Sequence, residues 1–257
     1  MTLEMIILLI VSGIVVGFIN TLAGGGAIMS MTVFMALGLP IGVANGTNRI
    51  AVVLQNLTSS AVFIKKRLLD IKSGLKLSVP AIIGNIAGSM VATQINETVF
   101  KICMGVVLFA ILAYMLFAKT HIHGGHGLEI KWWHYLWFLL IGFYGGYVYI
   151  GLGYLILAIT LTTMHLDIIT ANVIKGFVIF VATPFSLIVF MLHGQVDYGV
   201  GLLHALGNII GTYVASHYGI HWGTKFLKYF MIAVVLVSIA DLFGWISLHD
   251  ICVSLIH

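Results

Sequence analysis

The chain has 257 residues, of which 61% are hydrophobic and only 8% are charged, with a formal net charge of +4. A soluble domain carries about a quarter charged residues, so this chain lacks the polar surface of one and is predicted to be an all-α integral membrane protein. Its near-continuous apolar character excludes an outer-membrane barrel, and no basic patch interleaved with aromatic residues points to nucleic acid.

The first apolar stretch carries Glu4 in place of the positive residues that open a signal peptide, so we interpret it as a structural helix. Ten hydrophobic segments are expected in chain order: about 4–22, 26–39, 44–64, 74–95, 98–118, 133–150, 153–166, 170–192, 199–217 and 226–247. The second and seventh are short for a span of roughly 20 residues, and each follows a glycine cluster. We therefore expect broken or re-entrant helices there; whether 26–39 and 153–166 cross fully stays open.

The chain repeats itself at an offset of 127 residues. The matched positions include Gly24 on Gly151, Gly26 on Gly153, Ala44-Asn45 on Ala171-Asn172 and Asp70 on Asp197. Biased composition alone does not readily place glycines, an Asn and an Asp in one register. We predict a first transmembrane repeat over 1–118, a polar His- and Gly-rich linker over 119–132 and a second transmembrane repeat over 133–257.

The loop after the third segment is strongly basic, with Lys65, Lys66, Arg67, Lys72 and Lys76. By the positive-inside rule this loop is cytoplasmic. The equivalent loop from His193 has no Lys or Arg, and alternation from the basic loop puts it outside. Both termini are then expected outside, and the two halves are expected to be inverted, as in secondary transporters with broken helices. The aspartates matched by the repeat, Asp70 and Asp197, are interpreted as helix N-caps.

The glycine clusters are the first candidate site, formed by Gly24, Gly25 and Gly26 and by Gly151 and Gly153. Unwound backbone at membrane depth is tolerated only where protein buries it or water reaches it. A new helix that begins after each cluster would aim free N–H groups and a positive dipole end at it, and two such ends would attract an anion. The alternative is that these glycines only let helices pack closely. We favour the site because the clusters recur in register beside short segments.

Two cations stand just inside the third and eighth segments, Arg49 and Lys175. A cation within a span normally faces a cavity or a partner, and Asp241 is the only carboxylate deep in an expected span, so a carried anion is a candidate partner. The alternative is that both side chains snorkel to an interface. Neutral hydrogen-bonding neighbours favour the site. The candidate side-chain ligands are therefore Asn45, Thr47, Asn48, Arg49, Asn172 and Lys175.

His204 is a candidate proton relay, with Asp241 as a second; a packed, hydrogen-bonded histidine is the alternative. The linker histidines His121, His123 and His126 are spaced so that they could bind a transition metal, but no cysteine or paired acid accompanies them, so we expect no metal. No nucleophile elbow, HExxH or P-loop motif occurs, so no enzyme activity and no cofactor are expected.

Taken in chain order, the motifs of this sequence match the pattern of a known protein family. The run GFINTLAGGGAIMS is followed by ALGLP, VANGTN and KKRLLDIKSG, with an echo in the second half that includes YIGLGY. This chain resembles the sulfite exporter TauE/SafE family. The resemblance implies a multi-helix permease of the cytoplasmic membrane that moves small sulfur-containing anions, such as sulfite or organosulfonates, most often outward.

We therefore expect a permease that exposes one site alternately to the two sides of the cell inner membrane, in the direction of export. An anion-selective channel with the same site is the main alternative, and a metal permease that uses the histidine linker is a third. The expected partners are a small anionic substrate and the lipid bilayer, without nucleic acid. The oligomeric state stays open, a homodimer included.

Overall fold

The structure is a computed structural model that describes residues 1–94 and 129–219. Isolated positions are also described: 96, 98–100, 102, 103, 105, 106, 109, 229, 233, 236, 237 and 240. All regular structure within these residues is helical, which confirms the prediction of an all-α protein. The linker histidines His121, His123 and His126 and the candidate proton site Asp241 lie outside the described residues.

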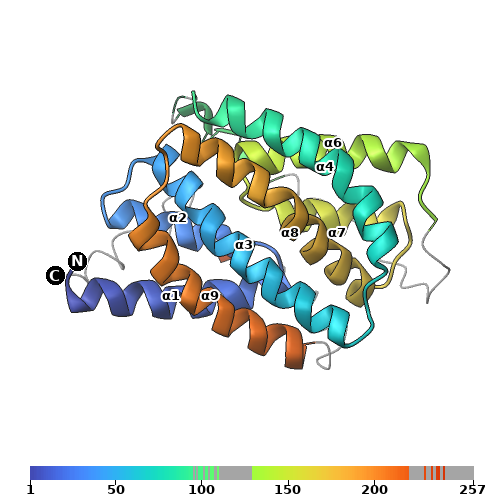
Figure 1. Cartoon of the computed structure of the whole chain (residues 1–257), viewed down its shortest axis with the longest axis horizontal. Coiled ribbons are helices and arrows are strands. Elements are labelled where there is room, and N and C mark those ends of the chain that lie inside the picture. Colours follow the sequence, from blue (N-terminus) through green and yellow to red (C-terminus); the bar gives the residue numbers. More distant parts are fainter. Residues whose placement is uncertain are drawn as a thin grey trace.

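The described helices lie close to the expected segments (Figure 1). They are α1 (Leu3–Leu22), α2 (Ala27–Ala36), α3 (Ile41–Lys65), α4 (Ile71–Ala92), α6 (Trp132–Tyr147), α7 (Leu152–Thr162), α8 (Ile168–Leu192) and α9 (Tyr198–Tyr218). Three of them, α1, α4 and α8, are long and apolar enough to cross a membrane. Helix α3 is equally long, but a buried polar stripe lowers its hydropathy.

Aspartates begin three of these helices, because a carboxylate satisfies N–H groups that have no partner within the helix. Asp70 caps α4 and Asp197 caps α9, which confirms both expected N-caps. Asp167 caps α8 in the same way, through the N–H groups of Ile169 and Thr170. The hydroxyl of Ser73, with backbone N–H groups, holds the pKa of the exposed Asp70 carboxyl below its usual value.

The helices pack in exchanged pairs. Helix α1 of the first half lies along α9 of the second, and α6 of the second half lies along α4 of the first. Figure 1 shows these pairs on opposite sides of the molecule, with α3 and α8 crossing between them. The offset of 127 residues relates the bounds of α3 (41–65) to those of α8 (168–192), and the start of α4 at 71 to the start of α9 at 198. Inversion of the halves relative to a membrane stays a prediction.

Small residues allow the exchanged pairs to touch backbone to backbone, as in many membrane helix pairs. A Cβ atom added to Gly13 of α1 would clash with the carbonyl oxygen of His204, and one added to Gly207 of α9 would clash with that of Ile10. The α4–α6 pair is equally close, since a Cβ on Gly84 would clash with the carbonyl oxygen of Leu139.

Helix α2 turns back along α1 after the first glycine cluster. A Cβ on Gly26 would lie 2.9 Å from the carbonyl oxygen of Val16, and Ser30 and Ser12 contact the same imidazole, that of His204. With 10 residues α2 is roughly 15 Å long, half of a hydrocarbon core of about 30 Å. Its counterpart α7 has 11 residues. Both elements are therefore short, as the sequence indicates, and each begins inside the helix bundle.

Candidate site at the two helix breaks

The two glycine clusters meet. A Cβ atom on Gly24 would lie 2.7 Å from the Cα of Gly153, and one on Gly153 would lie 2.6 Å from the Cα of Gly24. Gly24 has φ of +91° and Gly151 has φ of +77°, a left-handed conformation that favours glycine. Only glycine therefore allows both the sharp break and the contact. The structure brings together the clusters that the sequence singles out.

Each break is followed by the start of a helix without a side-chain cap. Gly26 is the N-cap of α2 and Gly151 is the N-cap of α7, and neither end has a side-chain hydrogen bond. The first N–H groups of a helix have no partner within the helix and carry the positive end of its dipole. Two such ends that meet make a place where negative charge is stabilised.

Tyr154 adds a hydroxyl at this junction. Its side chain is only 2% exposed, and its hydroxyl has no hydrogen-bond partner among the described residues. The hydroxyl lies against Gly25, where an added Cβ would clash with it. A buried polar group without a partner is costly, so it marks a position where a ligand group could bind. The sequence reasoning missed Tyr154; its place directly after Gly153 is the signal that could have found it.

Arg49 is completely buried and binds the end of α6. Its guanidinium donates to the carbonyl oxygens of Gly145 at 2.6 Å and Gly146 at 3.1 Å, and to Asn45 Oδ1 at 3.0 Å. The Nε atom has no partner among the described residues. The snorkelling alternative is wrong for this residue, because 0% of its surface is exposed.

Two aromatic rings flank the same guanidinium. Its Cζ atom lies 4.9 Å from the ring centroid of Tyr149 and 5.3 Å from that of Phe190. Cation–π contacts of this kind partly offset the loss of water around a buried charge. Arg49 is therefore held by two aromatic rings as well as by its hydrogen bonds.

Lys175 binds the end of α1 in the corresponding way. Its ammonium donates to the carbonyl oxygens of Asn20 at 3.2 Å and Thr21 at 3.0 Å, and to Asn172 Oδ1 at 2.7 Å. These three bonds use all three donors of an ammonium group. Lys175 is 3% exposed, so the snorkelling alternative is wrong here too.

The two cations are thus reciprocal caps. Arg49 of the first half neutralises carbonyls at the end of α6, and Lys175 of the second half does so for α1. A cation at a helix C-terminus is stabilised by the dipole and by the last carbonyls. Among the described residues neither forms a salt bridge with a carboxylate. The positive charge of the centre is therefore not neutralised by a described side chain.

The neutral candidates also contribute to this framework. Asn45 donates to the carbonyl oxygen of Tyr147 at 3.0 Å, and Asn172 donates to that of Ile168 at 2.9 Å. Thr47 accepts the N–H of Asp197 at 2.8 Å, which ties α3 to the start of α9. Asn48 is buried, with 2% of its surface exposed. Asn45, Arg49 and Lys175 thus bind the helix ends that precede the two breaks, mostly through backbone carbonyls. Thr47 lies instead at the start of α9, and Asn172 bonds within α8 and to Lys175.

His204 lies between three helices. Its Nδ1 is 3.1 Å from the carbonyl oxygen of Leu9, and its Nε2 is 3.0 Å from Ser30 Oγ. The ring also meets Phe34 edge-on, with centroids 4.9 Å apart. Both ring nitrogens have partners, which favours the packed, hydrogen-bonded alternative and leaves the proton relay a hypothesis.

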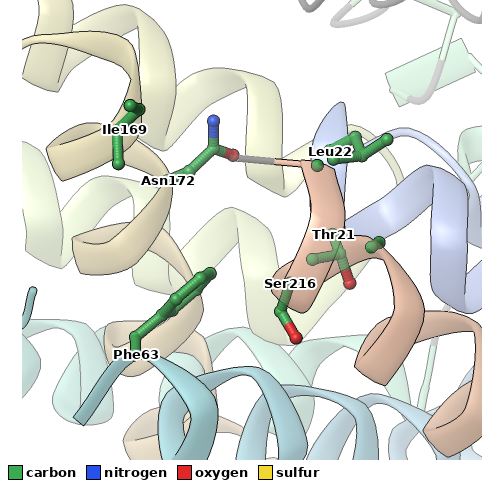
Figure 2. Close-up of a pocket in the computed structure, with 8 residues that line it drawn as sticks. Thr21, Leu22, Phe63, Ile169, Asn172 and Ser216 are labelled. Carbon is green, nitrogen blue, oxygen red and sulfur yellow. The ribbon is translucent and has the colours of Figure 1, made fainter. Parts of the chain in front are cut away.

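A pocket lies between the ends of α1, α3 and α9 and the start of α8 (Figure 2). The pocket is partly open to its surroundings. Figure 2 shows Asn172 on one side and Leu22 on the other, with Phe63 and Ser216 below them. The lining residues are Thr21, Leu22, Phe63, Ile169, Asn172, Ala215, Ser216 and Gly219. Of these, only Asn172 is a candidate from the sequence.

Known proteins align with this chain over most of its length. The family model described as sulfite exporter TauE/SafE matches residues 9–242. A probable membrane transporter protein of Haemophilus influenzae is 25% identical over 214 residues, 82% of this chain and 83% of the relative. The probable membrane transporter protein ORF9 of a Sinorhizobium species is 27% identical over 236 residues, 90% of this chain and 88% of the relative. The probable membrane transporter protein YfcA of Escherichia coli K12 is 24% identical over 242 residues, covering 88% and 85%. No solved structure matches the chain.

Proposed function

The chain belongs to the sulfite exporter TauE/SafE family, and we propose that it is a permease that exports a small sulfur-containing anion, sulfite or an organosulfonate, across the cytoplasmic membrane. Membership makes it a multi-pass membrane transporter, like the curated relatives. Substrate, direction and mechanism are the proposed part. No enzymatic role is part of the proposal.

The observation that carries the proposal is the contact between Gly24 and Gly153. It brings together two helix starts that have no side-chain cap, beside the unpaired hydroxyl of Tyr154. Backbone N–H groups and a hydroxyl bind an oxyanion without a fixed counter-charge that would have to be displaced at each turnover. We therefore place the substrate at this junction, against Gly25, Gly26 and Gly151.

Arg49 and Lys175 have a supporting role in this proposal. Their charges hold the ends of α6 and α1 and give the centre of the bundle a positive potential. An anion at the junction benefits from that potential without replacing the observed hydrogen bonds. The Nε of Arg49 is the nitrogen atom of the Arg49 and Lys175 side chains that has no partner among the described residues, so it is also available to a ligand.

Transport would proceed by movement of the two halves against each other. The exchange of α1 and α6 between the halves, and the reciprocal caps, support a structure in which the site lies between two related units. In secondary transporters with inverted repeats, such units expose a central site to each side in turn. The inverted repeats and export by alternating access both belong to the proposal.

A thermal-shift measurement on the detergent-purified protein tests the proposal. A ligand that binds only the folded state raises the melting temperature by mass action. We expect sulfite, thiosulfate, methanesulfonate or taurine to raise it and acetate at the same ionic strength to leave it unchanged. If none of the sulfur anions raises the melting temperature, the proposed site is wrong. A carrier should also show no single-channel currents in a planar bilayer, whereas a channel would.

A further inference from the structure

Two lysines form hydrogen bonds with residues that line the pocket. Lys66 of the basic loop donates to the carbonyl oxygens of His217, at 2.7 Å, and Ser216, at 3.4 Å. Lys175 donates to Thr21 and Asn172 on the other side. Ser216, Thr21 and Asn172 all line the pocket, so each of the two lysines is hydrogen-bonded to residues of its wall.

The carboxylate closest in sequence to the pocket wall is already engaged. Asp167 precedes Ile169 at the start of α8, and its Oδ1 accepts the N–H groups of Ile169 and Thr170 at 2.9 and 3.0 Å. Its Oδ2 accepts the hydroxyl of Thr170 at 2.6 Å. This carboxylate therefore acts as a helix cap, and its described hydrogen bonds are with its own helix.

The offset of 127 residues identifies an equivalent place at the opposite end of the molecule. Pocket residues Phe63, Ile169, Asn172 and Ser216 correspond there to Phe190, Gly42, Asn45 and Ser89. At that end the side chain of Gln195 covers the wall. Its amide lies 3.6–3.7 Å from where a Cβ on Gly42 would be, and its Nε2 donates to the carbonyl oxygen of Thr93 at 3.0 Å.

The two ends differ at the covering residue. The residue equivalent to Gln195 at the pocket end is Leu68, which is 38% exposed and is not among the residues that line the pocket. Tyr149, with φ of +68°, stands in the place of Leu22 and is buried under the guanidinium of Arg49. At the opposite end, Gln195 and Tyr149 thus stand at the wall. At the pocket end, the space beside Leu22 is open.

We propose that the pocket is the access site for a small oxyanion at the end of the basic loop, and that Gln195 closes the equivalent access site at the other end. The inference rests on the proposed function, because it assigns a path to the same junction. Thr21 and Leu22 line the pocket and directly precede the first helix break, so an anion in the pocket is next to the end of α1. Opening of the other end requires the bond between Gln195 and Thr93 to break.

Cysteine labelling of two equivalent serines tests this asymmetry. Ser216 and Ser89 are 1% and 0% exposed, and each hydroxyl donates to a carbonyl three residues back, to Tyr213 at 3.2 Å and to Ile86 at 2.9 Å. S216C and S89C are therefore matched substitutions, made in a chain in which both native cysteines are alanine. Each purified protein is treated with a small methanethiosulfonate reagent, and the labelling rate is measured by mass spectrometry.

We expect S216C to react at least tenfold faster than S89C, and sulfate or methanesulfonate to slow the reaction of S216C. Sulfite is not used as the probe here because it reacts with such reagents. Q195A should raise the rate of S89C about tenfold, whereas the matched control L68A should leave that rate unchanged. K66Q should weaken the protection of S216C by sulfate. S216C should still react faster than S89C in the K66Q background. Melting curves ensure that only folded variants are compared.

Equal rates for S216C and S89C, or a rate of S89C that does not respond to Q195A, would overturn the assignment of the closed end. A fast S216C reaction that neither anion slows would overturn the access site. These failures are distinct from failure of the proposed function, which the melting of the unmodified protein with sulfur anions decides separately. An anion that raises the melting temperature without protecting S216C would leave the junction as a site and remove the pocket from its path.

Discussion

Arg49 and Lys175 cap each other's half of the molecule: Arg49 in α3 binds the end of α6, and Lys175 in α8 binds the end of α1. This relationship changes the role expected for two intramembrane cations. A carried anion is not needed to compensate either charge in the first instance, because carbonyls at the ends of broken helices already do so. The helix breaks and the two cations therefore depend on each other. Substitution of either cation should first lower the stability of the fold.

The first prediction concerns Arg49. Its truncation in R49A orphans two buried carbonyls and the Oδ1 of Asn45, and each orphaned acceptor costs about 1–3 kcal/mol. We expect a strongly lowered melting temperature in detergent, and an intermediate value for R49K, whose ammonium can keep some of the bonds. A normal melting temperature together with a lost response to sulfite would instead make Arg49 a direct ligand.

The second prediction concerns Tyr154, whose hydroxyl has no described partner. In Y154F the ring stays and only that hydroxyl is lost, so the melting temperature without ligand should be unchanged or slightly higher. A hydrogen bond to a charged group is worth about 1.5–3 kcal/mol, so we expect anion affinity to fall about tenfold or more. Titration by isothermal calorimetry measures this. Y213F, at a ring that is 51% exposed, is the control, and equal affinities for both variants would refute the role of Tyr154.

The third prediction separates backbone strain from contact at the helix break. Gly24 and Gly38 both have positive φ, +91° and +87°, but an added Cβ meets Gly153 only at Gly24 and has open space at Gly38. A left-handed conformation costs a residue other than glycine roughly 1–2 kcal/mol. G38A should therefore show only that modest loss, whereas G24A should also displace α7. Gel filtration and melting of both variants provide the measurement, and similar losses would mean that the glycine contact is dispensable.

The fourth prediction concerns His204, whose two ring nitrogens contact α1 and α2. If the ring is a packing element, H204Q should lower the melting temperature and leave the pH profile of anion flux in proteoliposomes unchanged. S30A, which removes the partner of Nε2, should lower the stability by less, about 1 kcal/mol, and should also leave the pH profile unchanged. A flattened pH profile in H204Q with normal melting would establish the proton relay.

Much of the fold follows from sequence pattern, because helix spans, caps and glycine breaks are local. Asp70 and Asp197 cap their helices as expected, and the two glycine clusters that the repeat matches are in contact at Gly24 and Gly153. The partners of Arg49 could not be found in this way, since nothing local shows which distant carbonyls a buried cation will reach. The positions of Tyr154 and Gln195 also depend on tertiary packing. The two halves differ at the equivalent positions Gln195 and Leu68, where only the glutamine has a side chain that forms a hydrogen bond.

The exchanged helix pairs also bear on biosynthesis. Helix α1 is made before the other described helices, yet the surface that its glycines match belongs to α9, the last of them. During translation the face of α1 that carries Gly13 and Gly17 must therefore wait in lipid, or beside the insertion machinery, until most of the chain has been made. The pairing of α1 with α9 is consequently a late event in the assembly of this protein.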